Sequence, residues 1–319
     1  MKKLAVAILA ATLLSLTACG GTSPAAKTAG EGGLTPIKVG VITITDAAAA
    51  YVGVDQGFFE EEGLKAELVP AQGGAAIVPL VVSGGADFGF SNVTSLIIGR
   101  SKGLPLQIVS AGNATTGIEG KDFADVLVKD DSGIEDAGDL VHKKIAVNTL
   151  NNISDTTVRA AIEAAGADGS NVTFVEMPFP DMRAALAKGN VDAVATVEPF
   201  RSMILEDKTH SAVSNYAAPL TDLMVTAYFT SEQMAAQKPE VVEAFKRAMS
   251  KSLKYSDEHP DAVRKILPEF TAMDDDLVNR IVLPRFPSQV NRDSVNEVAE
   301  LALKNGLIDK LPDMEKFVP

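Results

Sequence analysis

The sequence predicts an α/β fold built as two lobes, and three observations support this prediction. Short apolar runs alternate with helix-like segments, and the connections between them are brief. This alternation is typical of parallel sheets with helices on both faces. The pattern restarts near residue 125. About 285 residues follow Pro36, which is large for one domain and fits two.

The first group of elements lies before residue 115, and its strands are short runs rich in apolar and β-branched residues. Strands are expected at 37–44, 65–70, 86–90 and 106–111. Helices are expected from 47 to about 56, at 75–83, and from 91 onward. Asp46 falls just past the end of the first strand, where it opens the helix that follows.

The second group repeats the alternation. Strands are expected at 125–128, 144–148, 172–176 and 191–197, with helices at 156–165 and 181–188. The last clear strand is expected at 223–230. Beyond it the chain reads as helical, and 239–253 carries an apolar stripe at helical spacing formed by Val241, Val242, Phe245 and Met249.

The N-terminus has the features of an export signal. Lys2 and Lys3 precede an apolar run, 4–14, that is shorter than the roughly 20 residues a membrane span needs. The segment Leu16-Thr17-Ala18-Cys19 then resembles the lipobox of bacterial lipoproteins. The resemblance implies a signal peptide, 1–18, that is removed, and a diacylglycerol on the thiol of Cys19. Residues 19–35 lack apolar periodicity, so they are expected to form a lipid-anchored flexible tether.

An ordinary secretory signal with an incidental cysteine is the alternative. Cys19 is the only cysteine of the chain, so it has no intramolecular disulfide partner. A lone free thiol is unfavourable in an oxidising compartment, which favours lipidation.

Charge and composition exclude several functions. The chain has 29 Lys and Arg against 42 Asp and Glu, a net charge of −13, and losing Lys2 and Lys3 makes it more negative. We therefore expect no nucleic-acid partner. The three histidines have no metal-ligand spacing, and no Gly-x-Ser-x-Gly or phosphate-binding motif occurs. We expect no enzyme activity, no metal and no cofactor.

Three motifs, taken with the order of the elements between them, resemble the binding proteins of nitrate/sulfonate/taurine-type ABC importers. That family includes binders of thiamine-pyrimidine precursors. The motifs are Gly57-Phe58-Phe59 through Glu62-Gly63-Leu64, then Ser83-Gly84-Gly85-Ala86-Asp87-Phe88-Gly89, then Asp192-Ala193 through Glu198-Pro199-Phe200.

The resemblance implies a type II periplasmic-binding-protein fold, with two open sheets and flanking helices joined by two crossing strands. Lobe one would comprise 34–122 plus 227–319, and lobe two 123–226. The crossings would lie near 122–128 and 225–228. The resemblance also implies an extracytoplasmic, membrane-anchored monomer whose partners are a small-molecule solute and the permease and ATPase of an importer.

Ligands of open α/β sheets bind beyond the carboxyl ends of the strands. This rule selects twelve candidate ligand-binding residues: Asp46, Gly73, Gly74, Asn92, Thr94, Asn113, Thr149, Asn151, Asn152, Ser154, Asp155 and Glu198. The segment 148–156 is the favoured site, because free N–H groups at a helix start bind anions. Short polar residues at a helix start also act as caps, which stabilise by about 1 kcal/mol. Both interpretations stay open.

The ligand class is open as well. A sulfonate, taurine-like or nitrate-like anion would use the helix ends. Asp46 and Glu198, from opposite lobes, would instead meet an amine-bearing group such as an aminosulfonate or an aminopyrimidine-like ring. The predicted function is a solute receptor that closes its interlobe cleft on the ligand. The alternative is a lipoprotein of the same fold that senses a ligand or scaffolds a partner without transport.

Overall fold

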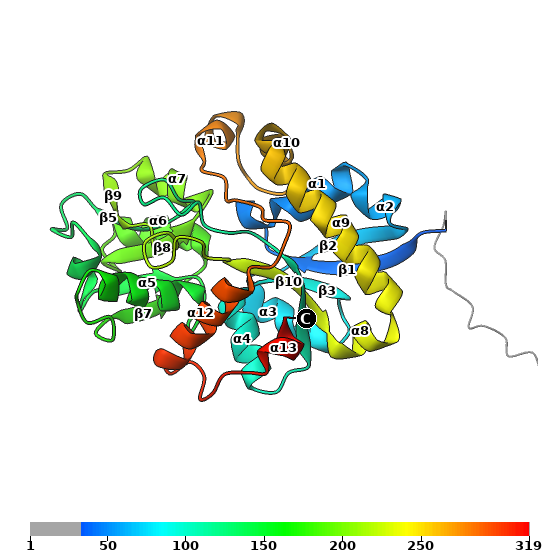
Figure 1. Cartoon of the computed structure of the whole chain (residues 1–319). Helices are drawn as coiled ribbons and strands as arrows, with labels where there is room; N and C mark the ends of the chain where they lie inside the picture. Colours follow the sequence, from blue (N-terminus) through cyan, green and yellow to red (C-terminus); the bar gives the residue numbers. More distant parts are fainter. Residues whose placement is uncertain (1–32, 319) are drawn as a thin grey trace, which may run out of the picture.

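The computed structural model describes residues 33–318, which form two lobes that each contain a five-stranded sheet (Figure 1). Cys19, the signal peptide and most of the tether lie outside the described residues. In lobe one the strands occur in the order β2 (Leu64–Pro70), β1 (Thr35–Val41), β3 (Phe88–Asn92), β10 (Thr226–Ser231) and β4 (Leu106–Ala111). In lobe two the order is β7 (Thr173–Glu176), β6 (Lys144–Val147), β8 (Ala193–Val197), β5 (Ala124–Lys129) and β9 (Thr209–Val213).

Both sheets are mixed, whereas the alternation of elements predicted parallel sheets. In lobe one β1 pairs in parallel with β2 and β3, and β10 pairs antiparallel with β3 and β4. In lobe two β6 pairs in parallel with β7 and β8, and β5 pairs antiparallel with β8 and β9. The reversed strands, β5 and β10, are the ones through which the chain enters each sheet from the other lobe.

The edge strand β9 was not predicted. Its sequence, Thr-His-Ser-Ala-Val, is short and mostly polar, and its first three residues are half-buried. An edge strand pairs on one side only and needs little apolar character. A search of the sequence for apolar runs therefore does not detect β9.

Helices flank each sheet. Those of lobe one are α1 (Ala48–Asp55), α2 (Phe58–Glu61), α3 (Gly74–Val82), α4 (Val93–Ser101), α8 (Glu232–Gln237), α9 (Pro239–Glu258), α10 (Pro260–Ile266), α11 (Asp275–Arg280), α12 (Arg292–Lys304) and α13 (Met314–Phe317). Those of lobe two are α5 (Ile153–Ala164), α6 (Phe179–Ala187) and α7 (Phe200–Leu205). Single 3₁₀ turns lie at Thr45–Ala47, Ala137–Leu140 and Leu267–Glu269. None of the helices between residues 33 and 318 is long and apolar enough to cross a membrane.

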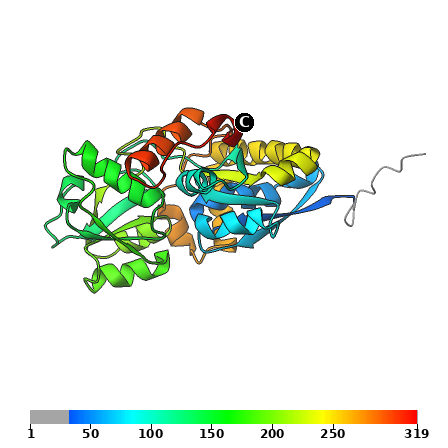
Figure 2. The same ribbon diagram turned by 90° about the horizontal axis from the view of Figure 1, so that it is seen from below.

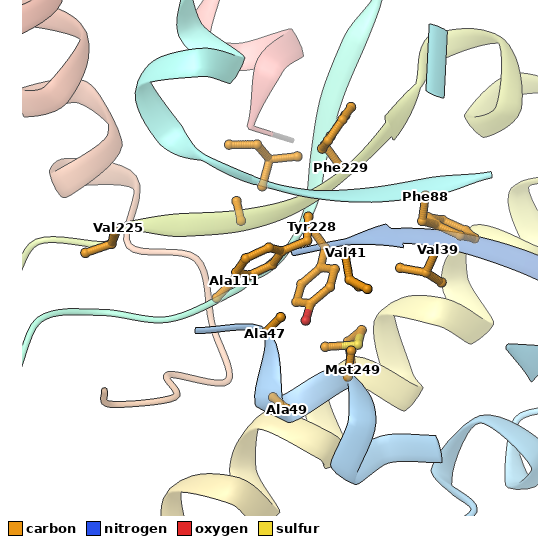
Figure 3. Close-up of a cluster of buried hydrophobic side chains, with 14 of the residues drawn as sticks. Val39, Val41, Ala47, Ala49, Phe88, Ala111, Val225, Tyr228, Phe229 and Met249 are labelled. Carbon is orange, nitrogen blue, oxygen red and sulfur yellow. The ribbon is translucent and has the colours of Figure 1, made fainter. Parts of the chain in front are cut away.

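The core of lobe one packs against the turn that carries Asp46. The stripe predicted on α9 is buried, and its Phe245 ring stacks on Phe88 of β3 with centroids 3.8 Å apart. Figure 3 shows the Tyr228 ring of β10 directed at Ala47, in the turn after β1, with Met249 beside it. Burying an aromatic or large aliphatic side chain contributes roughly 1.5–3 kcal/mol. This packing therefore holds the turn that carries Asp46 in a fixed position.

Two segments connect the lobes, residues 112–123 between β4 and β5 and residues 214–225 between β9 and β10. They run antiparallel, and Thr115 N–H donates to Leu223 O at 3.0 Å while Val225 N–H donates to Asn113 O at 3.0 Å. The ranges expected from the sequence, 122–128 and 225–228, lie at the lobe ends of these crossings. Paired crossings of this kind form a two-stranded hinge.

The C-terminal segment also touches both lobes. Figures 1 and 2 show α11 and α12 at the junction, where α11 packs on α7 and α12 packs on α5. Lys304 of α12 lies 2.6 Å from Glu163 of α5, and Arg280 of α11 lies 2.6 Å from Glu206 just after α7.

Candidate ligand-binding site

The carboxyl ends of the parallel strands in both sheets face the junction between the lobes. The residues that follow β1, β2, β3 and β4 therefore oppose those that follow β6, β7 and β8. The lobes come close at this junction, because a methyl group on Gly73 would lie 3.5 Å from Thr149 Oγ1. The strand-end rule thus brings the candidates of lobe one opposite those of lobe two.

Asp46 is the most informative residue on the lobe-one edge. It lies in the 3₁₀ turn Thr45–Ala47, its side chain caps no helix, and it is only 3% exposed. Its Oδ2 atom has no hydrogen-bond partner within the protein, and neither has the buried Oγ1 of Thr45. Buried polar atoms are nearly always paired. The unpaired atoms of Asp46 and Thr45 therefore make this edge a candidate ligand-binding site.

Asn113 and Thr94 add to this unpaired set. Asn113 is fully buried, and its Oδ1 accepts a hydrogen bond from Thr226 Oγ1 at 2.6 Å. Its Nδ2 donor and the Oγ1 of Thr94 make no hydrogen bond of normal geometry, although the Asn113 side chain lies close enough to Asp46 to lower the pKa of that carboxyl. Because Thr94 follows β3 and Asn113 follows β4, both lie on the same sheet edge as Asp46.

The electrostatics of this edge are unusual. Burial raises the pKa of Asp46 to about 7, the Asn113 side chain opposes the rise, and the negative charges of Asp122 and Glu198 add to it. A buried carboxylate with no countercharge is costly in its ionised form. Unlike Asp46, Asp122 is fully partnered, accepting hydrogen bonds from Thr115 Oγ1 at 2.5 Å and from two backbone N–H groups.

Other candidates on this edge have evident structural roles. Asn92 caps α4, since its Oδ1 accepts from Ser95 N–H at 2.9 Å. A Cβ on Gly74 would lie 2.1 Å from Ser91 Oγ, so a glycine is needed for α3 to approach β3 this closely. Gly73 precedes α3 without any side-chain cap. The free backbone N–H groups at the start of α3 are therefore available to a ligand.

In lobe two the segment after β6 is largely self-satisfied. Asp155 Oδ2 accepts from Asn151 N–H at 2.8 Å, and Asn152 Oδ1 accepts from Ile153 N–H at 2.6 Å. Asp155 Oδ1 is buried and unpaired, and burial raises the pKa of Asp155 to about 6. Asn151 is exposed and Thr149 half-buried, so these two lie at the rim, whereas Ser154 is buried beside Tyr216.

Glu198 is fully buried, but its carboxylate is already partnered. It accepts from Ser202 N–H at 3.1 Å and Ser202 Oγ at 2.9 Å, and it pairs with Arg201 at 3.2 Å. Its Oε1 also accepts from the backbone N–H of Val282 in lobe one at 3.2 Å. These partners make Glu198 part of a network between the lobes, and its contact with a ligand stays a prediction.

Sequence reasoning missed Asn215 and Tyr216, which follow β9. Tyr216 is buried between Ser154 and the charge of Asp46, and Asn215 has an unpaired, buried Oδ1. Recognition of β9 would have placed both residues just past a strand end and selected them by the same rule.

Two cavities lie between the lobes on either side of Ala75 and Thr149, which line both. The first, about 440 Å³, is bounded by the segments after β1, β2, β6 and β7 and by Phe179 and Phe200, whose stacked rings are 5.6 Å apart. The second, about 520 Å³, lies against α3, α4 and residues 149–152, with Lys102 and Leu307 at its margin. Both volumes suit a small molecule.

The paired hinge and the polar, partly unpaired edges between two mixed sheets define a two-lobed binding-protein fold. The alkanesulfonate-binding protein SsuA of Xanthomonas axonopodis pv. citri, solved with MOPS bound, has the same fold. Its TM-score is 0.75 at 16% identity, over 89% of this chain and 98% of that one. The fold is therefore the type II periplasmic-binding-protein fold.

The chain belongs to the NMT1/THI5 like family, which matches residues 44–263. A putative aliphatic sulfonates-binding protein of Bacillus subtilis is 24% identical over 100% of this chain and 95% of its own length. The formylaminopyrimidine-binding protein of Halalkalibacterium halodurans is 25% identical over 68% of this chain. The match covers 64% of that relative's length, which is slightly under two thirds. A 4-amino-5-hydroxymethyl-2-methylpyrimidine phosphate synthase of Aspergillus parasiticus is 22% identical, over 78% of this chain and 74% of its own.

Proposed function

We propose that this protein is the extracytoplasmic receptor of an ABC importer, which binds one small polar solute between its lobes and closes on it. The observation that carries the proposal is the set of buried, unpaired polar atoms on Asp46, Thr94 and Asn113 at the interlobe edge. Membership of a family with sulfonate-binding and formylaminopyrimidine-binding relatives supports the same function.

Its partners would be the permease and ATPase of the importer. The closed form of the receptor, stabilised by the bridging solute, would dock on the permease. The receptor would act as a monomer held at the membrane by the lipid on Cys19, with residues 19–35 as its tether. Two acyl chains rather than one would make this anchoring stable.

The proposal includes binding without catalysis. The synthase among the relatives raises the alternative, and the positions of the histidines argue against it. His210 is held by Asp130 and by Ile134 O at the edge of lobe two, and His259 stacks on Tyr255 at the end of α9. His142 is exposed in lobe two. Within residues 33–318, none of the three histidines is among the residues named above at the facing edges of the two sheets.

Thermal unfolding of residues 34–319 against a solute panel tests the function. The panel would contain taurine, alkanesulfonates, nitrate, bicarbonate and aminopyrimidines. A solute at 100 times its dissociation constant stabilises by about 2.7 kcal/mol and shifts the midpoint by several degrees. We expect at least one clear shift. No shift, together with no co-purified small molecule in native mass spectra, would favour a scaffolding lipoprotein instead.

A further inference from the structure

The charged groups at the interlobe edges restrict the class of solute, given that the proposed function is right. Asp46 and Asp155 each have a carboxylate oxygen that is buried without a partner, one in each lobe. An ionised carboxylate accepts hydrogen bonds and donates none. The unmet groups of the site thus include two strong acceptors and one amide donor, on Asn113.

Three arginines near the site are bound by other groups, whereas Lys102 lines only the cavity against α3 and α4. Arg201 is held between Asp125 at 2.5 Å and Glu198 at 3.2 Å. Arg159 donates to Gly169 O at 2.5 Å and lies over the Phe174 ring. Arg285 donates to Thr115 O at 2.7 Å and pairs with Asp222. An oxyanion in the site would therefore meet carboxylates without a free guanidinium to offset them.

Several helices begin at these edges, and the starts of α4 and α5 are occupied. Asn92 caps α4, and the start of α5 is taken by Asp155 and Asn152, which accept from the N–H groups of Asn151 and Ile153. The helices α1, α3, α6 and α7 begin without a side-chain cap. In α7, however, Glu198 accepts from the Ser202 N–H of the first turn. The helix start at the favoured segment 148–156 is therefore closed to an anion by the chain's own acceptors.

We propose that the site takes a cationic solute with N–H donors, such as a protonated amine or an amidinium, and that Asp46 is its countercharge. The hydroxyl groups of Thr45 and Thr94 and the amide of Asn113 complete the lobe-one contacts, and Asp155 is the second acceptor, from lobe two. The uncapped start of α3 has room for one acceptor atom of the same solute. Sulfonates and nitrate, which lack a positive charge, bind poorly.

Proton exchange gives this proposal a distinctive signature. The pKa of Asp46 is raised to about 7 by burial, with Asp122, Glu198 and Tyr216 as the other ionisable groups around it. A cation placed beside Asp46 lowers that pKa, so binding at pH 7 releases protons. An anion beside Asp46 raises it further, so binding takes protons up. The sign of the proton change therefore separates the two classes of solute.

The test is isothermal titration calorimetry at pH 7 in two buffers of different ionisation enthalpy. The probes are two matched pairs, propylamine with propanesulfonate and benzamidine with benzenesulfonate, and the tightest-binding solute of the thermal panel. We expect the cation of a pair to bind at least tenfold more tightly, with proton release. Asp46→Asn should weaken this binding at least tenfold and abolish the release. Asp130→Asn, at an exposed carboxylate on the edge of lobe two, should change neither.

Tighter binding of a sulfonate, or proton uptake with the best solute, would overturn the inference and leave the receptor function standing. Binding that Asp46→Asn does not alter, in a variant that unfolds as cooperatively as the wild type, would also overturn it. If no probe bound and no solute of the thermal panel shifted the midpoint, both the inference and the proposed function would fall.

Discussion

The Oε1 atom of Glu198 in lobe two accepts a hydrogen bond from the Val282 N–H in lobe one, with 3.2 Å between the two atoms. The same carboxylate is bound by Ser202 and by Arg201, which in turn pairs with Asp125 on β5. All of these groups except the Val282 N–H belong to lobe two. Glu198 therefore connects the sheet of lobe two to the C-terminal segment of lobe one.

Replacing Glu198 by alanine should destabilise the protein strongly. The change leaves Arg201 without one of its two buried partners, and breaking a buried pair typically costs about 3–5 kcal/mol. Urea unfolding measures the difference. Glu206→Ala is the control, because Glu206 is 40% exposed and its pairs with Arg183 and Arg280 are worth about 0–1 kcal/mol. Equal stability of the two variants would show that the buried network does not hold the fold.

Replacing Asp46 by asparagine should stabilise the ligand-free protein at high pH. Because the folded pKa, about 7, exceeds the ordinary value of 3.8, the folded state keeps a proton that the unfolded state loses. Stability therefore falls as pH rises from about 4 to 7, by at most about 1.4 kcal/mol per unit. Asparagine does not ionise, so the variant should match the wild type near pH 4 and unfold at a higher temperature at pH 8. A gap that is already present at pH 4 and constant to pH 8 would contradict the assignment.

Enlarging Gly73 should hinder closure without affecting the fold. Gly73 has an extended backbone that any residue adopts, with φ of 178°. A methyl group there would make ordinary contact with Thr149 across the junction, whereas a longer side chain would hold the lobes apart. Gly73→Leu should weaken solute binding at least tenfold in titration calorimetry and leave the melting temperature of the free protein unchanged. Gly73→Ala is the matched control and should bind nearly as the wild type does.

Cys19 should determine where the full chain is found in the cell. The wild type, expressed with its signal, should incorporate a labelled fatty acid and partition into detergent. Cys19→Ser should do neither and should be recovered in the aqueous extracytoplasmic fraction, because the thioether needs the thiol. Fatty-acid labelling of Cys19→Ser at the wild-type level would exclude this residue as the anchor.

The strands that the sequence predicts best are the buried ones. The expected range 106–111 coincides with β4, because a compact apolar run stands between Pro105 and Gly112. The polar edge strand β9 escaped prediction, and so did the strand directions. Direction depends on pairing between distant segments, such as Tyr228 of β10 with Phe90 of β3, and no local pattern encodes it.

The positions of the candidate site residues in the fold were predicted to a similar degree, and their contact with a ligand stays a prediction. Strand ends located Asp46, Thr94 and Asn113, because the carboxyl edge of a sheet follows from the strand assignments alone. The hydrogen-bond partners of each side chain did not follow from the strand assignments. Glu198 and Val282 are 84 positions apart, so the sequence could not indicate that this carboxylate is already bound while that of Asp46 is free.

Small-angle X-ray scattering of residues 34–319, with and without a saturating solute from the thermal panel, tests the central claim most directly. The account predicts that the solute reduces the radius of gyration of a monomer, because the lobes close about the paired crossings at 112–123 and 214–225. It also predicts that the bound protein scatters as the structure described here, in which Gly73 meets Thr149. A radius of gyration unchanged by a solute that binds at a stoichiometry of one would contradict closure on the ligand.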